Sequence, residues 1–129
     1  MKESDLQVQI ADYLRLQYPD VLFHSDFGSG VKLTVGQAVK QKRQNGGRRA
    51  WPDMFIAETV QVSGTWYHGL FLELKKEGVR LKKKSGEWAN EHIAEQANVL
   101  HQLETRGYKA EFTVGFDEAK KLIDEYLRV

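Results

Sequence analysis

The stretch MFIAETVQVSGTWYHGLFLELK, residues 54–75, decides the fold of this 129-residue chain. It contains two β-rich runs, 54–62 and 65–75, separated by Ser63-Gly64, a pattern that predicts a β-hairpin with a short connection. Asp53 stands where the first run begins, and Glu73 and Lys75 stand where the second run ends. Because the hairpin is antiparallel, we expect these side chains to converge at the end of the sheet far from the turn.

Outward from the hairpin, hydrophobic periodicity predicts helices and strands in alternation. The expected helices are residues 4–18, 35–44, 90–106 and 117–127, and the expected further strands are residues 21–24 and 108–114. A basic loop is expected at residues 78–86. The fold class is therefore α/β, with a small mixed sheet, a central β-hairpin and flanking helices.

Length and composition bound the class of protein. At 129 residues and 14.9 kDa, the chain is expected to form a single domain over residues 1–129. It has no cysteine, which excludes disulfides and thiolate metal sites. No apolar run approaches the ~20 residues that span a bilayer, and the N-terminus MKESDLQVQI is too polar for a signal peptide. We therefore expect a cytoplasmic protein without a targeting signal.

The formal net charge of +1 hides a strongly uneven distribution. Residues 27–52 hold six bases and no acid, and residues 75–84 hold six bases and one acid. The last 45 residues hold nine acids and five bases. Each basic block alone fits a solvated loop, but two blocks that flank a segment with isolated carboxylates fit a polyanion site better.

The converging carboxylates predict a metal site. Asp53 and Glu73 repel each other at short range and need a compensating cation. Their oxygen ligands favour Mg²⁺ or Mn²⁺, which bind through one or two carboxylates plus substrate phosphate. Lys75 could then stabilise the transition state or help to activate the attacking water. The alternative is that Asp53 caps a turn and that Glu73 and Lys75 form a cross-strand surface pair.

These residues also carry a resemblance to a known family. Pro52-Asp53 followed by Glu73-Leu74-Lys75 resembles the motif of the PD-(D/E)XK nuclease superfamily. Further features resemble its VRR-NUC family, in the stand-alone phage or bacterial form, from about residue 3 to residue 127. They are Glu3-x-x-Leu6-Gln7-x-x-Ile10, Gly47 and Arg48-Arg49 before Trp-Pro-Asp, Glu95-Gln96, and Gly107-Tyr108.

The resemblance implies a restriction-endonuclease-like core and assigns roles to residues. Asp53 and Glu73 match the metal-binding acids, Lys75 matches the catalytic lysine, and the backbone carbonyl of Leu74 would be a further metal ligand. Residues 59–67 depart from the compact family pattern by lengthening the Asp-to-Glu spacing, which moves neither catalytic end.

Three further residues are candidates for the same site. Glu3 matches the first-helix acid that points to the metal, directly or through water; its alternative role is to stabilise the helix dipole. Gln7 lies one turn after Glu3 on the same face and is expected to support the site. Gln96 matches a helix glutamine that orients catalytic groups or contacts phosphate, although a plain surface glutamine fits nearly as well.

Together these features predict a Mg²⁺- or Mn²⁺-dependent endonuclease that hydrolyses DNA phosphodiester bonds, and small members of the family imply a homodimer acting on branched DNA. Binding is expected to depend strongly on salt and weakly on sequence. The expected DNA-binding residues are Lys40, Lys42, Arg43, Arg48, Arg49, Lys76, Arg80, Lys82, Lys83 and Lys84. The alternatives are a DNA-binding module with a nuclease-like fold that does not cut, and a protein-interaction domain that ignores nucleic acid.

Other signals carry less weight. The four histidines share no metal-ligand spacing and are expected at the surface or in packing. Gly28-Ser29-Gly30 lacks a phosphate-loop pattern and is expected to form a mobile loop near the site. Trp51, Trp66 and Trp88 could each stack on a base or pack in the core, and Trp51 is the best candidate for stacking because it adjoins Asp53.

Overall fold

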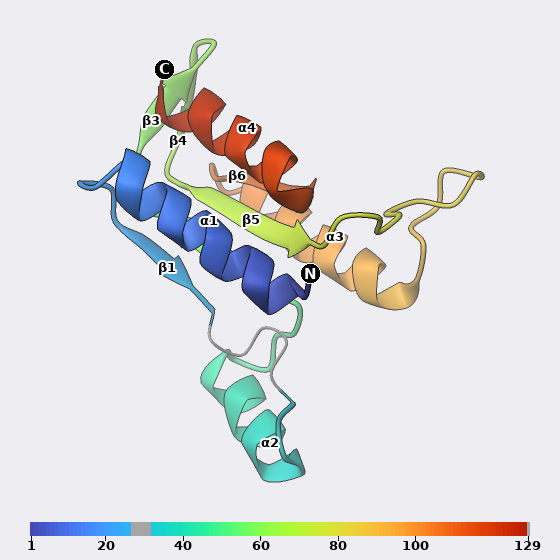
Figure 1. Ribbon diagram of the computed structural model, residues 1–129. Coiled ribbons are helices and arrows are strands. Elements are labelled where there is room, and N and C mark those ends of the chain that lie inside the picture. Colours follow the sequence, from blue (N-terminus) through green and yellow to red (C-terminus); the bar gives the residue numbers. More distant parts are fainter. Residues whose placement is uncertain (27–31, 129) are drawn as a thin grey trace.

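The computed structural model describes residues 1–26 and 32–128, so the loop expected around residues 28–30 lies outside the described residues. The main sheet has the strand order β1-β2-β5-β6, made of β1 (Phe23–Ser25), β2 (Met54–Ile56), β5 (Leu70–Lys75) and β6 (Lys109–Val114). The β1–β2 and β2–β5 pairs are antiparallel, whereas β5 and β6 are parallel. The helices are α1 (Glu3–Gln17), α2 (Val35–Gln44), α3 (Glu91–Glu104) and α4 (Gly115–Leu127). This arrangement confirms the predicted small mixed sheet with a central hairpin and flanking helices (Figure 1).

Helices cover the two faces of the main sheet unequally. On one face, Leu70, Leu72 and Leu74 of β5 pack into a core with residues of α1 and α4, and Ile10 and Ile123 are fully buried there. On the other face, Phe71 and Ala110 pack against Leu100 and Leu103 of α3. Because strand residues alternate between faces, Glu73 and Lys75 share the α3 face with Phe71.

A partly buried carboxylate ties α1 to α4. The hydroxyls of Tyr13 and Tyr18 both donate to Oδ1 of Asp124, each at 2.6 Å. Lys120 Nζ lies 3.2 Å from the other oxygen, Oδ2. These contacts fix the helix pair over the sheet and hold the N-terminal end of α1 near the end of β5 (Figure 1).

The predicted long hairpin is divided into two sheets. The expected run 54–62 forms β2 and then β3 (Val60–Val62), and the run 65–75 forms β4 (Thr65–Tyr67) and then β5. β3 and β4 pair only with each other, around Ser63 and Gly64, which both have positive φ as the tight hairpin turn requires. The two sheets separate because backbone groups between β2 and β3, and between β4 and β5, form hydrogen bonds with other parts of the chain. The Tyr126 hydroxyl donates to the Glu58 carbonyl, and the His68 N–H donates to the Gly107 carbonyl.

The other elements follow the prediction closely. The helix expected at 35–44 is α2, capped by reciprocal hydrogen bonds between Thr34 and Gln37. The helix expected from residue 90 begins at Glu91, because the Asn90 side chain accepts a hydrogen bond from the Ile93 N–H. Among the described residues, no helix has the length and apolar character needed to cross a membrane.

Gly69 provides a test of the packing between β2 and β5. A Cβ atom at this position would lie 2.6 Å from the Phe55 ring and 3.0 Å from the Ile56 carbonyl oxygen. The Phe55 ring cannot withdraw easily because it stacks on Phe71 with centroids 4.4 Å apart. We predict that Gly69→Ala lowers the free energy of unfolding by about 1–3 kcal/mol in urea titrations.

Gly36→Ala is the matched control, because a Cβ there has nothing within 4 Å and the position lies in a helix. Its unfolding free energy should stay within about 0.5 kcal/mol of the wild type. Equal stability of the two variants would contradict the tight packing at Gly69.

Candidate active site

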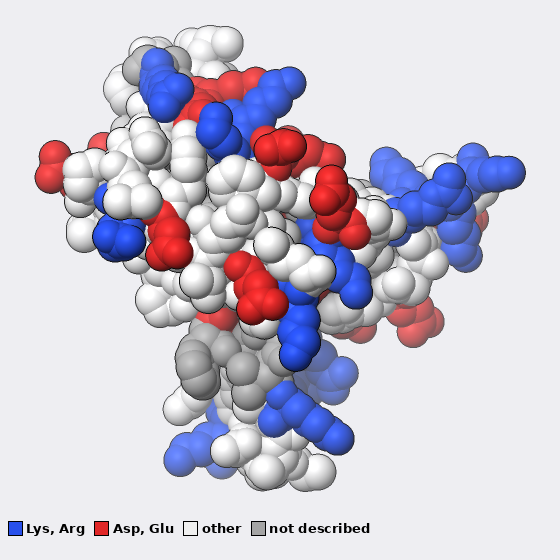
Figure 2. Space-filling model, viewed as in Figure 1, with Lys and Arg blue, Asp and Glu red and all other residues white. Residues whose placement is uncertain are grey.

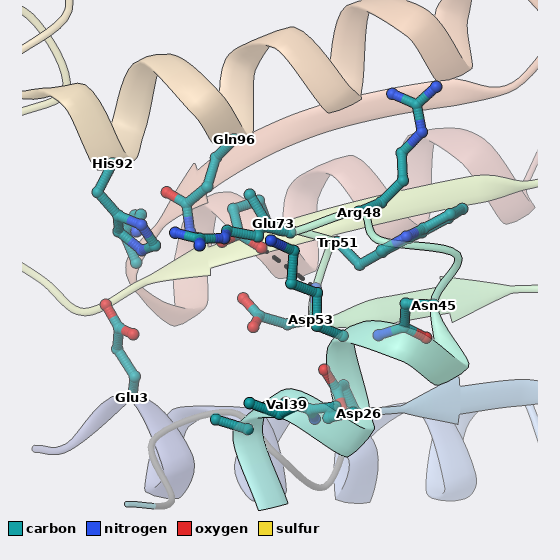
Figure 3. Close-up of a pocket in the computed structure, with 16 residues that line it drawn as sticks. Glu3, Asp26, Val39, Asn45, Arg48, Trp51, Asp53, Glu73, His92 and Gln96 are labelled. Atoms are coloured by element: carbon teal, nitrogen blue, oxygen red, sulfur yellow. Dashed lines mark hydrogen bonds between the residues drawn. The ribbon is translucent and has the colours of Figure 1, made fainter. Parts of the chain in front are cut away.

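The register of the hairpin brings Asp53 and Glu73 together. Met54 pairs with Leu72, so the preceding Asp53 stands opposite Glu73 at the end of the two strands. The Leu74 N–H donates to Oδ2 of Asp53 at 2.7 Å. The Asp53 N–H donates to Oε2 of Glu73 at 3.2 Å (Figure 3). Each carboxylate therefore accepts a hydrogen bond from the backbone of the opposite strand, and both side chains are fixed in place.

Gln96 approaches the pair from α3. Its Nε2 donates a hydrogen bond to Oε1 of Glu73, and its side chain is buried. Its other polar atom, Oε1, is also buried and has no hydrogen-bond partner within the described part of the chain. Of the two alternatives for Gln96, the structure favours the one in which it orients a carboxylate of the site over a surface glutamine.

Glu73 carries the strongest electrostatic perturbation at the site. Burial raises the pKa of Glu73 to about 9, the negative charge of Asp53 adds to this rise, and the positive charge of Lys75 opposes it. Glu73 thus holds a proton at neutral pH as long as no cation offsets the charge of Asp53.

Gln7 supports the site through the backbone. Its Nε2 donates to the carbonyl oxygens of Asp26 at 3.0 Å and Asp53 at 3.4 Å. The Asp26 N–H also donates to the Asp53 carbonyl at 2.7 Å. Gln7 therefore ties α1 to the start of β2, as expected from its position one turn after Glu3.

The carboxylate pair lies in an open pocket of ≈ 710 Å³. Glu3 and Lys75 line the same pocket, and the Glu3 side chain points from the start of α1 toward the space in front of Asp53 and Glu73 (Figure 3). Lys75 is only 6% exposed, so it is not part of a surface ion pair. The predicted convergence of the hairpin ends is thus realised in one cavity.

The basic residues divide between two places. Lys42, Arg48 and Arg49 line the pocket itself. Lys40 and Arg43 lie on α2, and Lys76, Arg80, Lys82, Lys83 and Lys84 lie on the basic arm, which we define as residues 76–90 between β5 and α3. Figure 2 shows blue side chains over both α2, below the body of the molecule, and this arm, to its right.

The donor set fits a hard divalent cation that keeps part of its water shell. No group of three acids or histidines among the described residues is arranged as a complete metal cage. Mg²⁺ does not need such a cage, because it binds through one or two carboxylates and retains several waters. Asp53 and Glu73 provide the carboxylates, and Oε1 of Gln96, for which residues 1–26 and 32–128 supply no hydrogen-bond donor, offers a further acceptor near them.

Two pocket residues were not identified from the sequence. Asp26 follows a three-residue strand and belongs to no motif, and only its tertiary pairing with Asp53 brings it to the pocket. His92 is expected, like the other histidines, at the surface or in packing, and this exposed side chain lies in the pocket wall. Its position one helical turn before Gln96 was a signal in the sequence.

The three tryptophans lie in different environments. Trp88 is partly buried against Phe112, with centroids 5.5 Å apart, and Trp66 is exposed on the β3–β4 hairpin. Trp51 lines the pocket beside Asp53 and is 41% exposed, so it is not a core residue.

Comparison with known proteins supports the resemblance at the level of fold. No protein-family model and no curated protein matches the chain. A solved structure described as "VRR_NUC domain protein" superimposes with a TM-score of 0.69 at 22% sequence identity, and covers 99% of this chain and 89% of its own. The chain has the VRR_NUC fold. The family resemblance in the sequence and the likeness in three dimensions thus agree, and the VRR_NUC fold accounts for the mixed sheet and its helices.

The pKa of Glu73 predicts how stability changes with pH in the metal-free protein. Unfolded Glu73 loses its proton near pH 4.5, whereas folded Glu73 keeps it up to about pH 9. Between these values the unfolded state binds fewer protons, so the contribution of Glu73 to stability is lost as pH rises. We predict that Glu73→Gln becomes progressively more stable than the wild type over this range, by up to about 1.4 kcal/mol per pH unit.

Urea unfolding in EDTA at a series of pH values measures this difference. Glu95→Gln, which changes an exposed glutamate on the same helix as Gln96, should follow the wild-type profile. Parallel profiles for Glu73→Gln and the wild type would show that Glu73 ionises normally in the folded protein.

Proposed function

We propose that the chain is one nuclease domain, residues 1–129, that hydrolyses DNA phosphodiester bonds with the help of Mg²⁺ or Mn²⁺. The observation that carries the proposal is the buried Asp53–Glu73 pair, locked by reciprocal backbone hydrogen bonds at the floor of an open pocket with a cationic rim. The VRR_NUC fold supports a nuclease-family domain. The cytoplasmic location expected from the sequence stays a prediction.

Asp53, Glu73 and the backbone carbonyl of Leu74 would hold the cation, with Glu3 contributing directly or through water. When bound, the cation would neutralise charge on the phosphate and favour ionisation of the attacking water. The cation would also reverse the rise in the pKa of Glu73, since a positive charge favours the carboxylate form. Gln96 keeps the Glu73 side chain in position through its hydrogen bond to Oε1.

Lys75 provides the remaining catalytic charge. It ends strand β5 two residues after Glu73 and lines the same pocket, with little exposure to solvent. An ammonium group held there can stabilise negative charge on the phosphate in the transition state or help to activate the water. Its low exposure strengthens this interaction, because a charge pair away from bulk water is weakly screened.

The basic residues would hold the DNA backbone. Lys42, Arg48 and Arg49 in the pocket wall contact phosphates near the scissile bond, and α2 and the basic arm contact phosphates further away. Such contacts give affinity that falls steeply with salt and depends little on sequence. We further propose that the substrate is branched DNA and that a symmetric homodimer cuts it, because a chain with one active site cuts one strand at a time.

Cleavage assays with site variants test the nuclease proposal. We predict that the wild type cuts plasmid or four-way-junction DNA with Mg²⁺ or Mn²⁺ and that EDTA abolishes the cutting. Lys75→Ala and Asp53→Asn should each lower the rate by about 100-fold or more, because each removes a charge that acts on the transition state.

Lys121→Ala, which removes an exposed lysine on α4, is the matched control and should cut at the wild-type rate. A wild-type protein that binds DNA and never cuts it with either metal would instead support the DNA-binding module. Undiminished cutting by both site variants would mean that the active site lies elsewhere.

Thermal unfolding with added metal tests the cation site separately from activity. A ligand that binds only the folded state stabilises it by about 2.7 kcal/mol at 100 times its dissociation constant. We predict that Mg²⁺ or Mn²⁺ raises the Tm of the wild type and that Asp53→Asn abolishes the increase. An equal increase in Tm for both proteins would place the bound cation away from Asp53.

A further inference from the structure

A second hollow of ≈ 350 Å³ adjoins the pocket that holds the carboxylates. The two cavities share Asp26, Gln41, Asn45, Trp51 and Asp53 in their walls. Its size falls in the range of about 300–1,000 Å³ typical of small-ligand sites. A group bound in this hollow would therefore lie directly beside the scissile phosphate of the proposed nuclease.

One wall of the hollow is aromatic. Phe55 and Phe71 stack with centroids 4.4 Å apart and an interplanar angle of 29°, and Trp51 packs against Phe71 at 6.1 Å. Tyr108 supports Phe71 edge-on at 5.3 Å. This wall is therefore held in place by neighbouring rings, while the indole of Trp51 keeps 41% of its surface exposed.

The backbone before Trp51 adds to this preorganisation. Ala50 has a φ of +63°, a left-handed conformation that non-glycine residues seldom adopt. Pro52 follows Trp51 and fixes the next φ angle. The indole is thus presented by a short segment with little conformational freedom, immediately before the catalytic Asp53.

Another part of the lining carries amide side chains. Gln41, Gln44 and Asn45 line the hollow from α2 and its C-terminal cap. Each amide offers both donors and an acceptor, which match the edge of a nucleobase. No lysine or arginine is found among the described residues that line this hollow, whereas Lys42, Arg48 and Arg49 line the neighbouring pocket.

We propose that this hollow binds one nucleobase of an unpaired nucleotide next to the scissile phosphate. The aromatic wall and the amides suit a flat, polar-edged base. The described lining holds no lysine or arginine and includes the carboxylates of Asp26 and Asp53, which argues against a phosphate. A base inside a continuous duplex cannot enter, because its faces and edge are already covered by stacking and pairing. The inference rests on the proposed nuclease function and names its substrate as DNA with unpaired nucleotides beside the cleavage point.

Binding to two matched DNA probes tests this inference. Both are labelled duplexes with a single-stranded tail of the same length, but in one probe the tail nucleotides are abasic. The phosphate charge is identical, so any difference in affinity comes from the bases. In EDTA, where no cleavage occurs, we expect the wild type to bind the base-bearing tail about tenfold more tightly by fluorescence anisotropy.

Two variants of the hollow locate the effect. Trp51→Ala should make the two affinities equal, while Trp51→Phe keeps an aromatic face and most of the difference. Gln44→Ala should reduce the difference as well, and it cannot disturb the core because α2 contains no buried residue. Trp66→Ala is the matched control, since Trp66 is 62% exposed on the distant β3–β4 hairpin and should leave the difference unchanged.

The outcomes separate this inference from the nuclease proposal. Equal binding of both tails by the wild type, or an unchanged preference in Trp51→Ala and Gln44→Ala, would overturn the nucleobase site even if the protein cuts DNA. A protein that binds neither probe and cuts no DNA would overturn the proposed function, and the nucleobase site with it.

Discussion

The structure depends on one reciprocal interaction, the pair of hydrogen bonds that joins Asp53 and Glu73 to each other's strand. It fixes the register of β2 against β5. If β5 slipped by one residue, Glu73 would point to the sheet face on which Leu72 and Leu74 are buried. The same contact holds two carboxylates in a buried place where they repel. Fold and chemistry are thus set by one constraint, and the proton that Glu73 holds at neutral pH relieves the repulsion between the two side chains.

The sequence was most informative where local patterns decide the structure. Alternating residues on β5 separate the leucines from Glu73 and Lys75, and hairpin symmetry then places Asp53 opposite Glu73. Long-range contacts explain what the sequence did not reveal. The division of the hairpin depends on Tyr126, which lies 68 residues from its partner Glu58, and on Gly107, which lies about forty residues from its partner His68. Likewise, Asp26 reaches the pocket through a pairing that no motif encodes.

The charged side chains at the centre of the site are buried, whereas the basic side chains around it are exposed. The carboxylates and Lys75 lie at its floor with little exposure, whereas the other cations are exposed on α2, on the segment after it and on the basic arm. The exposed cations provide long-range attraction to a polyanion, and the buried groups act at short range where screening is weak. A net charge of +1 is therefore compatible with a strongly polarised surface.

Helix α2 differs from the other helices, because none of its ten residues is buried and it extends away from the body of the molecule (Figure 1). A helix of this length is marginal in water without tertiary packing, so its capping box is its main support. Its local unfolding must therefore require much less free energy than global unfolding. One wall of both cavities therefore belongs to an element that opens more easily than the sheet and the helices packed on it.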